Sequence, residues 1–410
     1  MAGFVKEVTP RQQALSHISE ALNWPWACET EALELRSAIG RRLSSAIFAD
    51  SDHPPYTRSL RDGYAVWSGD VVSATTGTPA FLKLSGEVEM GAAPNFSVSS
   101  GEAAAVPTGG ILPDGADSVV MYENTARASD WVEVRAGVQS GDNIINVGED
   151  FSAGDKILRV GCMVDFKSVS LLAAVGVSKI KAAAPRISIL STGDEIVPAD
   201  TAVLPPGRVR DANSWSISAI LDKYRFKSSF AGILSDDEKS FEGRVLEELE
   251  KTDVLILSGG SSVGVRDRCS EVLSCLPSPG LMLRGVNIQP GKPTLAAGCV
   301  DGKKLVVALP GHPLSCFIVA YVLLLPMLLD MIGAEDKTTH TDITLPLSAD
   351  LPAKSGVEEF VPCKIQDGSA KPLNAKSGCV SAFADADGLI RIPENMETLR
   401  TGNAVEVWLW

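Results

Sequence analysis

Four short apolar runs alternate with helix-like segments between residues 186 and 309, and this alternation constrains the fold more than any other feature. The runs are RISILS (186–191), FAGIL (230–234), DVLILS (253–258) and KLVVAL (304–309). Such runs are typical of parallel strands that are buried on both faces. The segments 213–224, with Asn213 as its N-cap, and 236–250 predict helices between the strands. The sequence therefore predicts an open α/β sheet with right-handed crossovers.

The segments on either side of this sheet differ from it in periodicity. Apolar positions at helical spacing predict helices within residues 9–48, the first of them starting at a capping box formed by Thr9 and Gln12. Short alternating runs broken by Gly, Pro, Asn and Asp predict β-structure from about residue 56 to 143, and helical character returns at 166–176. Short strands are again expected toward the C-terminus.

A chain of 410 residues exceeds what one compact core normally contains, so several domains are expected. We predict a multidomain α/β and β protein. Its central part is an open α/β domain, and a β-rich domain is inserted into an N-terminal domain of mixed helical character. A small β-domain ends the chain. The predicted boundaries are 1–52 with 144–184 for the N-terminal domain, 53–143 for the inserted domain, 185–335 for the α/β domain and 336–410 for the C-terminal domain.

The composition excludes some classes of protein. A formal net charge of −14 argues against sequence-independent nucleic-acid binding, which needs a basic surface. The 8 cysteines form no CxxC pair and no zinc spacing, so they are expected to be reduced, packed thiols. The apolar run 316–329 is short for a membrane span and contains Pro326, which favours a buried core helix. The first residues lack a signal-peptide hydrophobic region, and we expect a cytoplasmic protein.

Glycines and serines follow two of the predicted strands at the edge where open α/β sheets bind ligands. RISILS runs into TGDE (192–195), and DVLILS runs into GGSSVGVRD (259–267). Glycines let backbone N–H groups approach an anion closely, and a helix beginning near Asp267 would direct its positive end at the same place. The carboxylates of Asp194, Glu195 and Asp267 could then hold a divalent cation against that anion.

Two further loops contain candidate polar residues. Lys292 lies between glycine and proline in PGKP (290–293), where a lysine on a rigid turn suits a phosphate or oxyanion but is equally typical of an exposed turn. The stretch LPGHPLSC (309–316) contains His312 and Ser315, whose spacing fits no catalytic triad. We therefore interpret His312 as a polar loop residue.

Eight motifs occur in a fixed order along the chain. They are RDGYAV (61–66), PTGGILPDGADSVVMYENT (107–125), GEDFSAGD (148–155), STGDEI (191–196), DAN (211–213), SGGSSVGVRD (258–267), PGKP (290–293) and LPGHPLS (309–315). Together they resemble the molybdopterin molybdenumtransferase family, which includes the MoeA proteins and the gephyrin E-domain. The resemblance extends over nearly the whole chain, through GVEEF (356–360) and ADGLIRIP (386–393) near its end.

The resemblance implies an enzyme that inserts molybdate into adenylylated molybdopterin and releases AMP, with magnesium or zinc as the divalent metal. It also implies a homodimer whose site is shared between subunits, and a molybdopterin adenylyltransferase that acts upstream. In the inserted domain of the partner subunit, the matching residues are Asp62 and Thr108.

The family motifs assign roles to residues of this chain by position. The implied catalytic residues are Asp62, Asp267 and Lys292, and the implied metal ligands are Asp194, Glu195 and Asp267. The implied substrate-binding residues are Thr108, Ser191, Thr192, Gly193, Asp211, Asn213, Ser258, Gly259, Gly260, Ser262, Gly264, Pro290, Gly291, Pro310, Gly311, Pro313 and Ser377.

The chain departs from the family pattern at three places where the family usually has cations. The segment Ile144 to Val147, with Ile145 and Asn146, replaces an arginine-rich run, Gln289 replaces a lysine, and the region of Pro362 lacks an arginine. These losses leave two other functions open. One is a binding or scaffold protein that keeps the fold without the chemistry, and the other is a nucleotide-pyrophosphate hydrolase that needs no molybdate.

Overall fold

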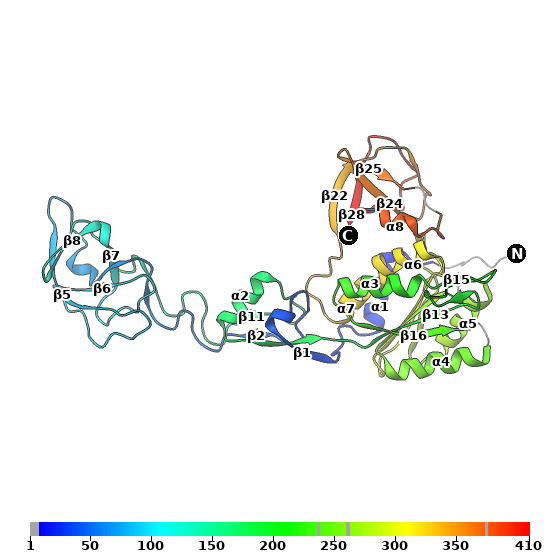
Figure 1. Ribbon diagram of the computed structural model, residues 1–410, viewed down its shortest axis with the longest axis horizontal. Coiled ribbons are helices and arrows are strands. Elements are labelled where there is room, and N and C mark those ends of the chain that lie inside the picture. Colours follow the sequence, from blue (N-terminus) through cyan, green and yellow to red (C-terminus); the bar gives the residue numbers. More distant parts are fainter. Residues whose placement is uncertain (1–7, 236–237, 260–262, 374–375) are drawn as a thin grey trace. The chain divides into compact units, whose positions relative to one another are not determined.

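The structure, a computed structural model, describes residues 8–235, 238–259, 263–373 and 376–410, without the side chains of 238–240 and 263–268. The chain forms two compact units, which are described separately (Figure 1). The first unit comprises Met1–Ser45, Arg159–Ser170 and Ser178–Trp410. The second comprises Ala46–Leu158 and Leu171–Val177.

A six-stranded sheet forms the centre of the first unit, and its strand order is β16-β13-β17-β21-β20-β18. The first four strands are parallel, and they are the four predicted apolar runs. The strands are β16 (Ser228–Leu234), β13 (Ile187–Thr192), β17 (Val254–Gly259), β21 (Lys304–Leu309), β20 (Leu295–Cys299) and β18 (Pro279–Leu283). The predicted open α/β sheet is therefore confirmed, with an antiparallel pair added at one edge.

Helices cover both faces of this sheet. Successive residues of a strand point to opposite faces, so each strand contributes side chains to both helix layers. Ile187 and Ile189 pack in the cluster that contains α1 (Arg11–Ala21) and α3 (Asn213–Lys223). Leu190 packs on the other face in the cluster that contains α4 (Glu238–Lys251) and α5 (Val263–Ser274). Burial on both faces explains the near-continuous apolar sequences of the central strands β17 and β21.

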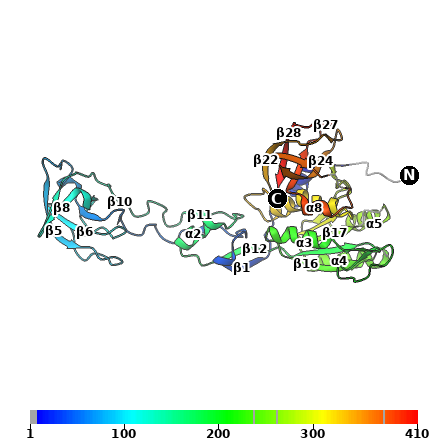
Figure 2. The same ribbon diagram turned by 45° about the horizontal axis from the view of Figure 1, so that its top comes forward.

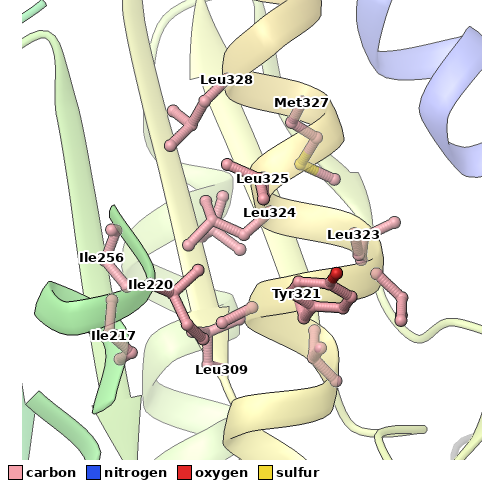
Figure 3. Close-up of a cluster of buried hydrophobic side chains, with 14 of the residues drawn as sticks. Ile217, Ile220, Ile256, Leu309, Tyr321, Leu323, Leu324, Leu325, Met327 and Leu328 are labelled. Atoms are coloured by element: carbon pink, nitrogen blue, oxygen red, sulfur yellow. The ribbon is translucent and has the colours of Figure 1, made fainter. Parts of the chain in front are cut away.

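A continuous helical segment completes the larger core cluster. It consists of α6 (Pro313–Val319), a π-helical turn η4 (Ala320–Leu324) and α7 (Leu325–Met331). Pro326 lies in the first turn of α7, where a helix tolerates proline, and the π-turn directly precedes it. The segment is long and apolar enough to cross a membrane, yet 83% of its most apolar window is buried inside the fold. Figure 3 shows Tyr321 and the leucines around it packed against side chains of α3 and the sheet, as expected of a core helix.

The C-terminal strands form a second sheet in the first unit, with the order β19-β24-β26-β28-β22 and β25 beside β24 (Figures 1 and 2). Its strands are β19 (Ile288–Gln289), β24 (Glu358–Gln366), β26 (Gly388–Ile392), β28 (Ala404–Leu409), β22 (Thr341–Pro346) and β25 (Ser369–Pro372). β19 comes from the PGKP region, so the C-terminal sheet is hydrogen-bonded to the chain that leads into that loop.

An ion cluster also links α1 to this sheet. The Glu358 carboxylate accepts hydrogen bonds from Arg11 Nε at 2.8 Å and from Arg391 Nε at 2.7 Å. Burial raises the pKa of Glu358, but the hydrogen bonds and charges of Arg11 and Arg391 outweigh it and hold the pKa below its usual value. The Glu358 carboxylate is therefore ionised in the folded protein at neutral pH.

The second unit contains a six-stranded sheet of order β7-β4-β6-β5-β9-β8 and is β-rich as predicted. The strands are β7 (Ser118–Met121), β4 (Gly63–Val66), β6 (Glu102–Val106), β5 (Ala80–Glu87), β9 (Trp131–Val134) and β8 (Thr125–Ala128). The unit also contains the pair β2 (Ile47–Phe48) and β11 (Lys156–Leu158), and the pair β3 (Arg58–Ser59) and β10 (Ile144–Ile145). The expected helix near residue 166 is α2 (Phe166–Ala174), whose residues are divided between the units.

The predicted helices within residues 9–48 are largely wrong. After α1, the chain forms β1 (Thr30–Glu34), which pairs with β12 (Lys179–Ala183), and then a short 3-10 turn. Along β1 half-buried residues alternate with exposed ones, so Leu33 lies on the half-buried face of a strand. The expected capping box is also absent, since α1 starts at Arg11 without a side-chain cap.

Two predicted helix starts are also wrong. Asn213 is the first residue of α3, and the side chain that caps the helix is Asp211, which accepts the Ser214 N–H at 3.1 Å. α5 begins at Val263, so Asp267 lies within the helix and not at its start.

Candidate functional site

A polar cavity of about 540 Å³ lies at the carboxyl edge of the parallel strands. It is called the first cavity here. The ends of β13 and β17 and the loop after β21 form its walls, as the strand-end rule for open α/β sheets predicts. Its lining includes Ser191, Gly193, Glu195, Arg210, Asp211, Asn213, Ser258, Gly259, Gly311, His312, Pro313 and Gly378.

Asp211 organises the floor of the first cavity. Its side chain is buried, and its Oδ2 accepts hydrogen bonds from Ser191 Oγ at 2.6 Å and from Ser214 Oγ at 2.7 Å. Ser191 Oγ also lies 3.2 Å from Ser258 Oγ, so the network joins the ends of β13 and β17 to the start of α3. A buried carboxylate with several donors is held in one position, which fixes the serines around it.

Asn213 lines the first cavity and has one unsatisfied polar atom. Its Nδ2 donates to the Gly311 carbonyl at 2.9 Å, which fixes the orientation of the amide. Its Oδ1 is buried and has no hydrogen-bond partner among the described residues. Leaving such an acceptor unpaired costs about 1–3 kcal/mol.

The glycines at the strand ends are required by close approach of the backbone. Gly259 has φ of +111°, and a Cβ there would lie 2.1 Å from the Thr192 carbonyl oxygen. Gly193 has φ of +138°, and a Cβ there would lie 2.8 Å from both carboxylate oxygens of Glu195. The absence of side chains thus keeps β13 and β17 close together and leaves room for Glu195 over the backbone.

Glu195 and Asp194 supply carboxylate oxygens beside the first cavity. Both side chains are exposed, Glu195 lines the cavity, and Asp194 Oδ1 accepts a hydrogen bond from Ser235 Oγ at 2.7 Å. Among the described residues, no three His, Cys, Asp or Glu side chains form a ready metal cage. Mg²⁺ needs only one or two protein carboxylates, with waters and substrate phosphate completing its shell, so this donor set fits that ion.

A second cavity, of about 760 Å³, lies beside the PGKP loop and the C-terminal sheet. Pro290, Gly291, Lys292 and Ser377 line it, as do Gln289, Lys354, Glu359 and Pro362. The two cavities adjoin at the start of α6, where Pro313 lines the first and Leu314 lines the second, and the Leu314 N–H donates to the Ser377 carbonyl at 3.0 Å.

Asp62 and Thr108 belong to the second unit, where the structure brings them together. The Thr108 N–H donates to Asp62 Oδ1 at 2.8 Å, and both residues are exposed. The hydrogen bond fixes the carboxylate just before the start of β4 and leaves its other oxygen for another partner.

The remaining predicted site residues divide into two groups. Thr192 and Pro310 line neither cavity, although Thr192 is buried beside β17 and its Oγ1 donates to the Ser258 carbonyl at 3.4 Å. Gly260 and Ser262 lie outside the described residues, as does the side chain of Asp267, and Gly264 is described only as backbone in α5.

The sequence reasoning missed Ser214 and Lys354. Ser214 directly follows the DAN motif, and its spacing of three residues from Asp211 is the signal of a cap. Lys354 precedes the GVEEF motif, but only the folded chain places it beside Gln289. Cys316, at the end of LPGHPLSC, is no nucleophile, because burial raises the pKa of its thiol and the Asp211 charge raises it further.

Three family descriptions match successive regions of the chain. Residues 9–176 match the description "MoeA N-terminal region (domain I and II)". Residues 188–330 match "Probable molybdopterin binding domain", which contains the first cavity's strand ends. Residues 344–410 match "MoeA C-terminal region (domain IV)".

Individual relatives agree with these matches. A molybdopterin molybdenumtransferase from Nostoc is 29% identical over 73% of this chain and 69% of its own length. A Methanocaldococcus jannaschii protein named for molybdopterin biosynthesis is 30% identical over 93% of this chain and 92% of its own. The crystal structure of the MoeA molybdopterin biosynthesis protein from Pyrococcus horikoshii superposes with a TM-score of 0.81 at 32% identity, covering 98% of this chain and 99% of that one. The chain therefore belongs to the MoeA family of molybdopterin biosynthesis proteins.

Proposed function

We propose that this protein is a molybdopterin molybdenumtransferase, which inserts molybdate into adenylylated molybdopterin and releases AMP. The observation that carries the proposal is the polar network at the carboxyl edge of the parallel strands, where the buried Asp211 holds Ser191 and Asn213 lines the first cavity. A pterin has N–H donors on its ring and its amino group, and polar side chains of this lining would bind them. The name of the Nostoc relative supports the same activity.

The two cavities contain different polar groups, which suit the two different substrates. The first cavity offers hydroxyls, a fixed amide and glycines that let backbone N–H groups face a phosphate. The second cavity contains Lys292 and Ser377, which suit a small tetrahedral oxyanion. Because the cavities adjoin at the start of α6, substrates bound in both would lie next to one another.

The carboxylates beside the first cavity are proposed to act in the step that breaks the phosphoanhydride bond. Asp194, Glu195 and Asp267 would hold magnesium or zinc, which supplies charge neutralisation for the phosphates as AMP leaves. Asp211 keeps Ser191 and Ser258 in place beside that group, so their orientation is set before substrate arrives.

The proposed assembly is a homodimer in the cytoplasm. Asp62 and Thr108 of each subunit would complete the site of its partner, and a molybdopterin adenylyltransferase would supply the substrate. The hydrogen bond from the Thr108 N–H to Asp62 supports this role, because it orients an exposed carboxylate.

The test is AMP release from adenylylated molybdopterin by the purified protein with magnesium, in the presence and absence of molybdate. The proposal predicts release that depends on molybdate. Equal release without molybdate would identify a pyrophosphate hydrolase instead. No release by a folded protein would identify a binding protein that has kept the fold without the chemistry.

A further inference from the structure

The second cavity contains a cation that the sequence motifs do not predict. Two lysines, Lys292 and Lys354, line the cavity, against the single carboxylate of Glu359. The position before PGKP, where the family often has a lysine, is Gln289 in this chain. An oxyanion with two negative charges needs more than one compensating cation in a partly enclosed site. Lys354 is therefore a candidate for the missing charge.

The backbone of Lys354 is held at the cavity by the loop that precedes β24. The Lys354 N–H donates a hydrogen bond to Glu359 Oε1. Two residues later, the Gly356 carbonyl accepts a hydrogen bond from Asn287 Nδ2 at 2.7 Å, and Asn287 directly precedes β19. The loop is thus tied at both ends to the two strands that border the cavity.

The side chain of Lys354 is held as well. Its Nζ donates to Gln289 Oε1 at 2.9 Å, across the cavity wall from the loop to β19. An ammonium group has three donors, so this bond leaves two for an anion. A lysine at position 289 would repel Lys354, whereas the neutral glutamine positions it. The two residues therefore act as a pair.

We propose that Lys354 supplies the second positive charge for the oxyanion in the second cavity, with Gln289 as the residue that positions it. The ammonium of Lys354 replaces the charge of the family lysine at position 289. This inference rests on the proposed function, since it assumes that the second cavity binds molybdate. It identifies Lys354 as a determinant of oxyanion affinity and gives Gln289 a positioning role.

The experiment compares the wild type with Lys354→Gln, Lys354→Arg and a matched control, Lys364→Gln. Lys364 is an exposed lysine on β24 that lines neither cavity, about 17 Å along the strand from Glu359. Binding of molybdate alone is measured by calorimetry at two salt concentrations. The KM values for molybdate and for adenylylated molybdopterin are measured separately, and a thermal melt confirms that each variant is folded.

We expect Lys354→Gln to weaken molybdate binding about tenfold, which corresponds to about 1.4 kcal/mol, and to reduce its salt dependence. The KM for adenylylated molybdopterin should not change. Lys354→Arg should restore most of the affinity, because it retains the charge, and Lys364→Gln should match the wild type.

Two results overturn the inference in distinguishable ways. If the wild type binds molybdate and Lys354→Gln binds it equally well, Lys354 has no role while the proposed function stands. If the wild type binds no molybdate and shows no molybdate-dependent release of AMP, the inference and the proposed function both fail.

Discussion

Replacing Gly259 with alanine tests whether the strand ends are held together as the structure shows. The new Cβ would lie 2.1 Å from the Thr192 carbonyl oxygen, a backbone atom that can move only with β13. The φ of +111° adds strain of about 1–3 kcal/mol for a residue with a side chain, and overpacking adds about 1–3 kcal/mol. We expect Gly259→Ala to lower the free energy of unfolding by about 2–6 kcal/mol.

The matched control is Gly243→Ala, in α4 on the same sheet. No heavy atom lies within 4 Å of a Cβ built at Gly243, and its φ is not in the left-handed region. Alanine in a helix is favoured over glycine by about 1 kcal/mol, so this variant should be slightly stabilised.

The assay is urea unfolding, with hydrogen exchange measured on peptides that contain β13 and β17. Gly259→Ala should shift the midpoint to lower urea and increase exchange in both strands, while Gly243→Ala should do neither. Wild-type stability and exchange in Gly259→Ala would show that the two strand ends do not approach as closely as described.

Three further predictions concern individual side chains. Asn213→Ala should weaken binding of a pterin ligand about tenfold, measured by calorimetry, because a polar side chain of the cavity lining is lost; unchanged affinity would exclude its role. Lys292→Gln should raise the KM for molybdate without changing the melting temperature, and a matching fall in stability would indicate a structural role instead. The pKa of Glu358 in the folded protein lies below its usual value. Its ionised carboxylate therefore adds fully to the free energy of unfolding at pH values above the usual pKa, and this contribution is lost as the pH falls through the pKa of the folded protein. Glu358→Gln should therefore destabilise the protein by about 3–5 kcal/mol at pH 7 and flatten the acid limb of its stability profile, measured by urea unfolding at several pH values.

The α/β sheet was predictable because burial on both faces leaves its signature in the strands themselves. The runs that became β13 and β17 are short, rich in Ile, Leu and Val, and followed or ended by glycine, which identified the strands and predicted a ligand-binding edge. The short strand β1 was not predictable in the same way. Glu31 and Leu33 lie on its half-buried face, and over five residues a two-residue period and a helical period are hard to distinguish.

The site was predictable only where neighbouring residues in the sequence act together. The DAN motif located the cap of α3, but both Asp211 and Asn213 are good cap formers, and only the packing of β13 against α3 assigns the role to Asp211. The second cavity combines Gln289, Lys354 and Ser377, which are far apart in the sequence. The pairing of β19 with β24 brings the first two together, and no local pattern encodes that pairing.

The most direct test of molybdenum insertion is the ratio of molybdenum atoms in the pterin product to AMP molecules released. Purified protein is incubated with adenylylated molybdopterin, molybdate and magnesium, the pterin is isolated, and its molybdenum is determined by mass spectrometry. The proposed function predicts one molybdenum atom for each AMP. Release of AMP with no molybdenum in the pterin would contradict it.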